Sequence, residues 1–142
     1  VKEKGLVDVA LPSNANALPA IRTLTNGKGC EKTVDCSGSA AGRLLAIQAT
    51  RIWGANVMIG EDGEVTFRPS ADLMHDHKTI FGSWVTGIWR MEELVERMVR
   101  WKIHPHDLIT TRLPLERVGE GFALMEEGKC GKVAICFDEE LA

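Results

Sequence analysis

The sequence predicts an α/β fold, with a parallel sheet and flanking helices, in a single unit of 142 residues. Short runs rich in β-forming residues alternate with segments of helical spacing, which is typical of repeated βα units. Two of these runs are nearly continuous in apolar residues, as parallel strands buried on both faces are. With 44% hydrophobic residues, the chain is long enough to bury one core and too short for two ordinary domains.

The predicted strands are short, and each is bounded by polar or turn-forming residues. Glu61 to Glu64 read as a turn, and residues 65–67 read as a brief extended piece that follows it. The four principal strands are expected at Val7–Leu11, Lys32–Cys36, Asn56–Ile59 and Thr79–Phe81.

The predicted helices follow from the spacing of apolar residues and from their end signals. Gly54 is expected to stop the first helix, while Pro114 and Gly128 flank the last one. The middle helix repeats apolar residues at i, i+3, i+4 and i+7, with charged residues between them. The helices are expected at residues 40–52, 91–98 and 116–127, with a shorter one at 71–77 behind Ser70 as its N-cap.

The charge balance excludes two classes of partner. Lys and Arg number 17 against 20 Asp and Glu, a net charge of −3 without long runs of one sign, so no nucleic acid and no anionic membrane is expected as a partner. The apolar stretches are shorter than the roughly 18 residues of a membrane helix, and the N-terminus lacks the shape of a signal peptide. We therefore expect a cytoplasmic protein.

Four cysteines are present without any C-x-x-C spacing. Three of them lie in or beside apolar, strand-like segments, and cysteine is among the most buried residue types. Buried free thiols are therefore predicted for Cys30, Cys36, Cys130 and Cys136.

The carboxyl ends of the predicted strands are where an open parallel sheet binds its ligands. Gly38, Gly60 and Gly82 stand at or near three of these ends. Only glycine removes the Cβ from a close approach, so three together favour a flat or bulky ligand. Turns alone could also require each of them.

No standard catalytic signature occurs in the sequence, whether a glycine-rich dinucleotide or phosphate loop, a zinc-protease motif or a nucleophile elbow. Asp35 could serve as a general base, but an aspartate at a strand end more often binds nearby backbone amides. The four tryptophans are interpreted as core and interface residues.

Two H-x-H pairs could chelate a metal, and both are weak candidates. The pair His75 and His77 falls at the end of a predicted helix, and the pair His104 and His106 falls in a proline-containing loop. We therefore predict no catalytic residue and no metal ligand in this chain.

Several segments carry a family resemblance through their order and spacing. They are Leu24–Gly29, Thr33–Gly38, Val57–Gly60, Thr79–Trp84, Leu108–Leu115, Gly121–Phe122 and Glu127–Val133. Together they resemble the medium-chain, zinc-type alcohol dehydrogenases, in particular the polyol and threonine dehydrogenase branches, over essentially the whole chain.

The resemblance implies an incomplete Rossmann-type sheet. In the family the six strands lie in the order 3-2-1-4-5-6, and this chain would begin in the helix before the third strand. It would lack the first two strands, the glycine-rich turn and the zinc-bearing catalytic domain. Residues 1–107 would form a partial dinucleotide-binding domain, and residues 108–142 would return towards the catalytic domain.

The resemblance also implies NAD as cofactor, with NADP as the alternative. The family's zinc ligands lie in the missing part, so zinc would belong to the parent protein, an oxidoreductase acting on CH–OH groups, and this chain alone would be inactive. Lys132 falls where many members place an arginine on the pyrophosphate. The cofactor-binding residues are expected to be Cys36, Ser37, Gly38, Gly60, Glu61, Phe81, Gly82, Ser83 and Lys132.

Two other readings remain open at this point. In the family, the last strand of the sheet pairs edge to edge with its symmetry mate, which would make residues 78–81 the contact of a homodimer. The chain could then be a structural or dimerisation fragment without cofactor binding of its own. A different Rossmann-like enzyme, such as a methyltransferase, is the other reading. The substrate is not assigned.

Overall fold

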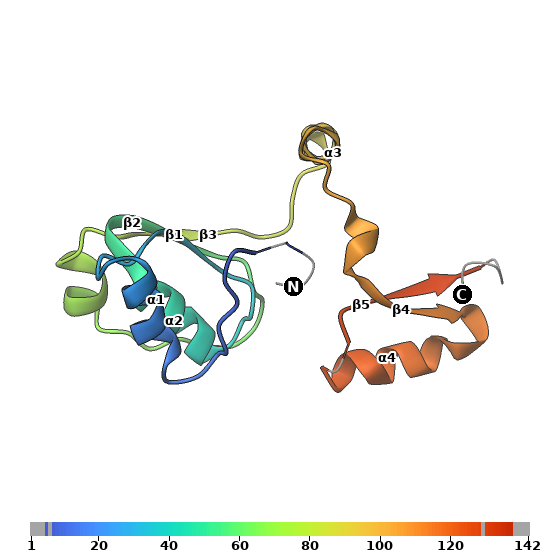
Figure 1. The fold of residues 1–142 in the computed structure, drawn as a ribbon, viewed down its shortest axis with the longest axis horizontal. Coiled ribbons are helices and arrows are strands. Elements are labelled where there is room, and N and C mark those ends of the chain that lie inside the picture. Colours follow the sequence, from blue (N-terminus) through green and yellow to red (C-terminus); the bar gives the residue numbers. More distant parts are fainter. Residues whose placement is uncertain (1–4, 6, 129, 138–142) are drawn as a thin grey trace. The chain divides into compact units, whose positions relative to one another are not determined.

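The computed structural model describes residues 5, 7–128 and 130–137. The chain divides into two compact units, residues 1–85 and residues 86–142 (Figure 1). The assignment of residues 1–107 to a partial nucleotide-binding domain and of residues 108–142 to a returning segment stays a prediction.

The first unit is a three-stranded parallel sheet with two helices on one side of it (Figure 1). Its strands lie in the order β1-β2-β3, which is also their order along the chain. Asp35 lies opposite Met58, and Met58 lies opposite Gly82, so the three strands end at one edge. The elements are α1 (Ala17–Leu24), β1 (Cys30–Asp35), α2 (Ala40–Ala49), β2 (Thr50–Met58), a π-helical turn (Pro69–Met74) and β3 (Thr79–Gly82).

The second unit contains a βαβ crossover. β4 pairs with β5 in parallel, and α4 connects the two strands. Gly121 lets α4 approach the strands closely, since a Cβ there would lie 3.2 Å from Val133 Cγ1. The elements are α3 (Trp89–Trp101), a 3₁₀ turn (Pro105–Leu108), β4 (Ile109–Pro114), a second 3₁₀ turn (Leu115–Arg117), α4 (Val118–Glu126) and β5 (Lys132–Cys136).

The α/β class is confirmed, and so are the helices predicted at residues 91–98 and 116–127, which correspond to α3 and α4. The helix α1 and the strands β4 and β5 were not predicted from the sequence, and neither was the 3₁₀ turn at Pro105–Leu108. β4 mixes apolar with charged and hydroxyl residues, so it lacks the continuous apolar run that signals a strand buried on both faces. β5 does contain such a run, at residues 133–136, so the signal for this strand was present in the sequence.

The strand predicted at residues 7–11 is wrong. These residues have no regular structure and are exposed. In the family's strand order 3-2-1-4-5-6, residues 7–11 would be the third strand, which pairs only with the second. None of the described strands of this chain is that second strand. A β-rich run without a neighbour leaves its backbone groups to water, so its intrinsic preference is not enough to form a strand.

The first predicted helix ends three residues too late, because α2 stops at Ala49 and Gly54 lies within β2. Thr50 already has extended backbone angles. Its hydroxyl donates to Ala46 O at 2.7 Å and lies 2.7 Å from Thr33 Oγ1 on β1. The helical spacing of apolar residues continues beyond Ala49. The helix nevertheless ends there, because the Thr50 side chain ties the start of β2 to β1.

The segment between β2 and β3 differs from its prediction as well. Residues 65–67 are not a strand, and the helical turn starts at Pro69 with Arg68, not Ser70, as its N-cap residue. The Asp72 carboxylate accepts a hydrogen bond from Arg68 N at 2.8 Å, which holds that start. Among the described residues, no helix has the length and apolarity that crossing a membrane requires.

The expectations of burial for cysteine and tryptophan are wrong for this chain. Cys36 is exposed, and the other three cysteines are half-buried. Trp53, Trp84, Trp89 and Trp101 are each more than half exposed, so none of them is a core residue. A role of these tryptophans at an interface stays a prediction.

Candidate functional site

The carboxyl-end edge of the first sheet brings together the predicted site residues of that unit. Cys36 to Gly38 follow β1, Gly60 and Glu61 follow β2 after Ile59, and Phe81 to Ser83 close β3. The shared register of the three strands places these segments at one edge of the sheet. Segments up to 47 positions apart in sequence are therefore neighbours, as in a ligand site on an open sheet.

Asp35 holds the turn after β1. Its Oδ1 accepts hydrogen bonds from Ser37 N at 3.1 Å and from Ser37 Oγ at 2.6 Å, and its Oδ2 accepts one from Gly38 N at 3.3 Å. The interpretation of Asp35 as a carboxylate that binds backbone amides is confirmed. A carboxylate committed to these donors is a structural group and a poor general base.

The electrostatics of Asp35 agree with that role. The side chain is 3% exposed. Burial alone raises the pKa of this carboxyl, but the hydrogen bonds from Ser37 and Gly38, together with the Arg43 guanidinium, outweigh burial and hold the pKa below its ordinary value. Asp35 is therefore ionised at neutral pH, as its hydrogen-bond donors require.

Three glycines close the gap between the loops that follow β1 and β2. A Cβ on Gly38 would lie 1.9 Å from Glu61 O, one on Gly60 would lie 2.2 Å from Gly38 N, and one on Gly63 would lie 2.1 Å from Gly38 O. The sequence suggested that a flat or bulky ligand explains such glycines. For Gly38 and Gly60, the close neighbour is instead the backbone of the other loop.

Gly82 at the end of β3 behaves differently from the other two strand-end glycines. A Cβ placed there would meet no atom within 4 Å. Phe81 is 52% exposed beside it, and Ser83 N donates to Met58 O at 3.0 Å, which continues the ladder between β2 and β3. Open space for a ligand therefore lies over the end of β3, next to the closed pair of loops.

Arg43, a residue that sequence reasoning missed, connects the same two loops. It lies in the first turn of α2, and its guanidinium donates to Gly60 O at 2.7 Å and to Gly63 O at 2.6 Å. Its Nε lies 3.6 Å from Asp35 Oδ2. A signal was present, because a cation in the first turn faces the positive end of the helix dipole and needs a specific partner there.

Lys132 belongs to the second unit and is not placed relative to the other predicted site residues. It opens β5 and is exposed. The neighbouring turn is held by Gly131 N, which donates to Thr110 Oγ1 at 2.9 Å. A contact between Lys132 and a cofactor stays a prediction.

The two histidine pairs differ in their surroundings. His77 stacks on Trp53 with ring centroids 4.3 Å apart, and the rings of His104 and His106 are 5.5 Å apart. Among the residues that the structure describes, no group of three or more His, Cys, Asp or Glu side chains could hold a metal ion.

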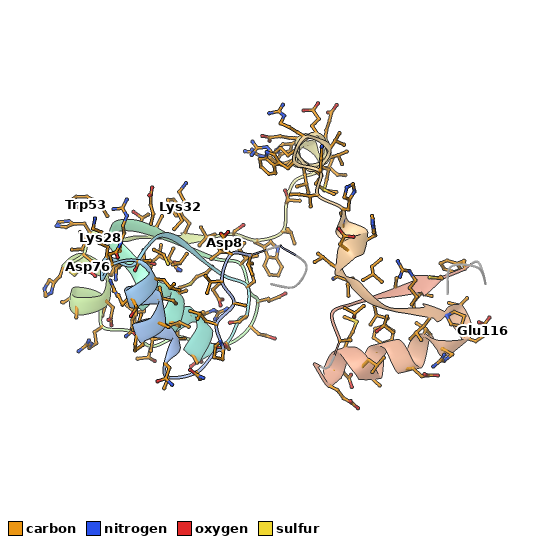
Figure 2. The ribbon with its side chains drawn as sticks, in the orientation of Figure 1. Asp8, Lys28, Lys32, Trp53, Asp76 and Glu116 are labelled. Carbon is orange, nitrogen blue, oxygen red and sulfur yellow. The ribbon has the colours of Figure 1, made fainter. Side chains whose placement is uncertain are left out.

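A hollow of about 450 Å³ opens at the amino ends of the strands. Figure 2 shows Lys28, Trp53 and Asp76, which contribute to its lining, on the same side of the first unit. Its arginines already have partners, since Arg22 donates to three backbone carbonyls and Arg51 pairs with Glu31. None of the predicted site residues lines this hollow, so the carboxyl-end edge is the stronger candidate site.

Comparison with known proteins gives consistent matches. The model of a family described as zinc-binding dehydrogenase matches residues 1–100. The zinc-type alcohol dehydrogenase-like protein YphC of Escherichia coli (strain K12) is 48% identical over 139 residues, which is 97% of this chain and 39% of that protein. The chain thus spans well under two thirds of the length of this relative.

Two solved structures are similar to the chain in fold. The crystal structure of an NAD-dependent alcohol dehydrogenase is 30% identical, with a TM-score of 0.72 over 85% of this chain and 35% of that one. The alcohol dehydrogenase of the archaeon Aeropyrum pernix is 20% identical, with a TM-score of 0.80 over 94% of this chain and 38% of that one. The second likeness is one of fold alone.

Proposed function

The chain belongs to the zinc-binding dehydrogenase family, and we propose that it forms the cofactor-binding part of an NAD(P)-dependent zinc-type alcohol or polyol dehydrogenase. The observation that carries this proposal is the meeting of three strand ends at one edge, where the Gly38, Gly60 and Gly82 segments lie together. Ligands of open α/β sheets bind beyond the carboxyl ends of strands.

The residues at this edge fit part of a nicotinamide dinucleotide. In the proposal, Cys36, Ser37 and Gly38 lie towards the adenosine, and Gly60 and Glu61 towards the nicotinamide ribose. The space that Gly82 leaves open supports a contact between the nicotinamide carboxamide and residues 81–83. Since Ser83 N already donates to Met58 O, Ser83 would meet the carboxamide through its other polar atoms.

The pyrophosphate is the part of the cofactor that has the fewest proposed contacts with the described residues. The proposal gives this contact to Lys132, whose ammonium is a point charge and cannot form the bidentate pair of an arginine. When bound, the dinucleotide supplies the hydride chemistry, and the residues named above bind and orient it. In the proposal, NAD is the cofactor and NADP the alternative.

The described residues do not fit the zinc site of such an enzyme, since no cluster of ligands is present among them. The proposal therefore assigns zinc to the rest of a parent protein, and it expects the chain alone to be inactive as a dehydrogenase. The cytoplasmic location expected from the sequence stays a prediction, which cell fractionation would test.

Calorimetric titration of the chain with NADH tests the proposal, with tryptophan fluorescence followed in parallel because Trp84 adjoins the nicotinamide segment. Saturable binding is the expected result, and NADPH titrated in the same way separates the two cofactors. If no heat and no fluorescence change appear up to millimolar NADH, the chain does not bind the cofactor by itself and the proposal fails in that form.

A second candidate function, a dimerisation fragment, is favoured by the position of β3. Within the described residues, this strand, like β1, lies at one end of the sheet order and pairs only with β2. An edge strand offers unpaired backbone groups to a second copy, so residues 78–81 would form the contact of a homodimer. Sedimentation at several concentrations tests this, since a monomer at every concentration would exclude it.

A further inference from the structure

Arg43 ties the loop after β2 to the end of β1. One nitrogen of its guanidinium binds Gly60 O at 2.7 Å and another binds Gly63 O at 2.6 Å, so two carbonyls three residues apart are held by one planar group. The side chain is 12% exposed, and its Nε faces the Asp35 carboxylate at 3.6 Å. This carboxylate in turn holds Ser37 and Gly38.

Backbone hydrogen bonds also join the two loops. Both Ile59 N and Gly60 N donate to Asp35 O, at 2.9 and 3.0 Å. The two loops lie so close together that Gly38, Gly60 and Gly63 have no room for a Cβ. The two loops therefore form one continuous wall, with no space for a ligand between them.

We propose that Arg43 is a positioning residue, which fixes this wall in the position that cofactor binding beside the end of β3 requires. The proposal rests on the proposed function, because it assumes that the dinucleotide lies on the carboxyl-end edge. Arg43 contacts Gly60, Gly63 and Asp35, and it acts by fixing the positions of these residues.

Charge alone does not explain the arrangement. A lysine would keep a cation near Asp35 but is a single point charge, and it could not bind two carbonyls with a planar group. The first turn of a helix disfavours a cation because it lies at the positive end of the helix dipole. The contacts of Arg43 with Gly60 O, Gly63 O and Asp35 offset this unfavourable interaction. An arginine is the residue that meets both requirements.

The experiment compares Arg43→Met and Arg43→Lys with the unsubstituted chain. The matched control is Arg51→Met, which removes an arginine from the amino end of β2, where it pairs with Glu31. Amide hydrogen exchange at Ser37, Gly38 and Gly60 reports the order of the wall without any cofactor, and NADH titration reports binding. Thermal unfolding and circular dichroism establish that each variant is folded.

In Arg43→Met, we expect exchange at the three amides to become at least about tenfold faster and NADH to bind at least about tenfold more weakly, a factor that corresponds to about 1.4 kcal/mol. Exchange in the centre of β2 should not change. Arg43→Lys should fall between the unsubstituted chain and the methionine variant, and it keeps the test usable if Arg43→Met does not fold. Arg51→Met should behave as the unsubstituted chain in both measurements.

Two results would overturn the inference. If Arg43→Met keeps the exchange rates of the wall, Arg43 does not order these loops. If exchange accelerates but NADH binds to both proteins equally well, the wall does not position the cofactor, although the proposed function stands. A different result, no NADH binding even by the unsubstituted chain, removes the proposed function and the positioning role with it, and the exchange rates still show whether Arg43 orders the loops.

Discussion

At the scale of single residues, the Asp35 carboxylate organises the turn after β1 by accepting from Ser37 and Gly38. Because the pKa of Asp35 is lowered in the folded chain, this group stabilises the fold at pH values above its unfolded pKa, which is about 3.9 for aspartate. That contribution is lost as pH falls through the lower pKa of the folded state.

Asp35→Asn is therefore expected to destabilise the first unit at neutral pH by about 1–3 kcal/mol, since the amide keeps one accepting oxygen and replaces the other with a donor, which leaves either Ser37 N or Gly38 N without its acceptor. It should also flatten the decline of stability on acidification below about pH 4, where an unsubstituted aspartate would begin to protonate. Denaturant unfolding at pH 7 and between pH 3 and 5 measures both effects. A variant with the same acid decline as the unsubstituted chain would contradict the assignment.

The strand-end glycines permit a second prediction at this scale. Gly60→Ala should destabilise the chain by at least about 2 kcal/mol, because its Cβ would lie 2.2 Å from Gly38 N and backbone cannot move aside cheaply. Gly82→Ala is the matched control, expected within about 0.5 kcal/mol because the space there is open. Thermal or denaturant unfolding of both variants decides, and equal effects would mean that the loops are not in contact.

At the scale of elements, α2 begins at a true cap. Ser39 has extended backbone angles, and its Oγ accepts from Gly42 N at 3.1 Å. The sequence reading placed a serine cap elsewhere, at Ser70, but the π-helical turn begins at Pro69 behind Arg68. The two serines thus occupy different positions relative to their helices, which makes them a natural pair for comparison.

Ser39→Ala is expected to cost about 1 kcal/mol of stability, the usual loss for an N-cap. Ser70→Ala, as its control, should change stability by no more than about 0.5 kcal/mol. Far-ultraviolet circular dichroism during urea unfolding measures both. If Ser70→Ala proves the more damaging change, the start of the π-helical turn is not as described.

The helices differ in how well local sequence patterns predict their bounds. α3 and α4 were predictable, because an apolar stripe of helical period with end signals is written within the element itself. The end of α2 was not, because the apolar spacing runs on past Ala49, while the Thr50 hydroxyl contacts Ala46 and Thr33, the latter 17 positions away. A boundary set by a distant partner has no local signal.

At the scale of the whole molecule, residues 7–11 have the composition of a strand and the structure of a loop. Their amides should exchange in the isolated chain at close to the unprotected rate, since no strand pairs with them. In a chimera that joins this chain to the N-terminal part of the Escherichia coli relative, we expect the same amides to become protected, on the hypothesis that this part supplies the second strand. Hydrogen exchange followed by mass spectrometry compares the two, and unchanged exchange in a folded chimera would refute the explanation.

By itself, the sequence determined the α/β class, the two helices with regular apolar stripes, and the candidate segments that follow the strands, because each of these is signalled by neighbouring residues. Only the tertiary structure decided that Gly38, Gly60 and Gly63 close on one another, and that Arg43 binds the loop 17 to 20 positions further along the chain. Such contacts depend on the register of β1 and β2, which brings distant backbone together. A glycine looks the same in sequence whether its close neighbour is a cofactor or another loop, and only the three-dimensional arrangement distinguishes the two.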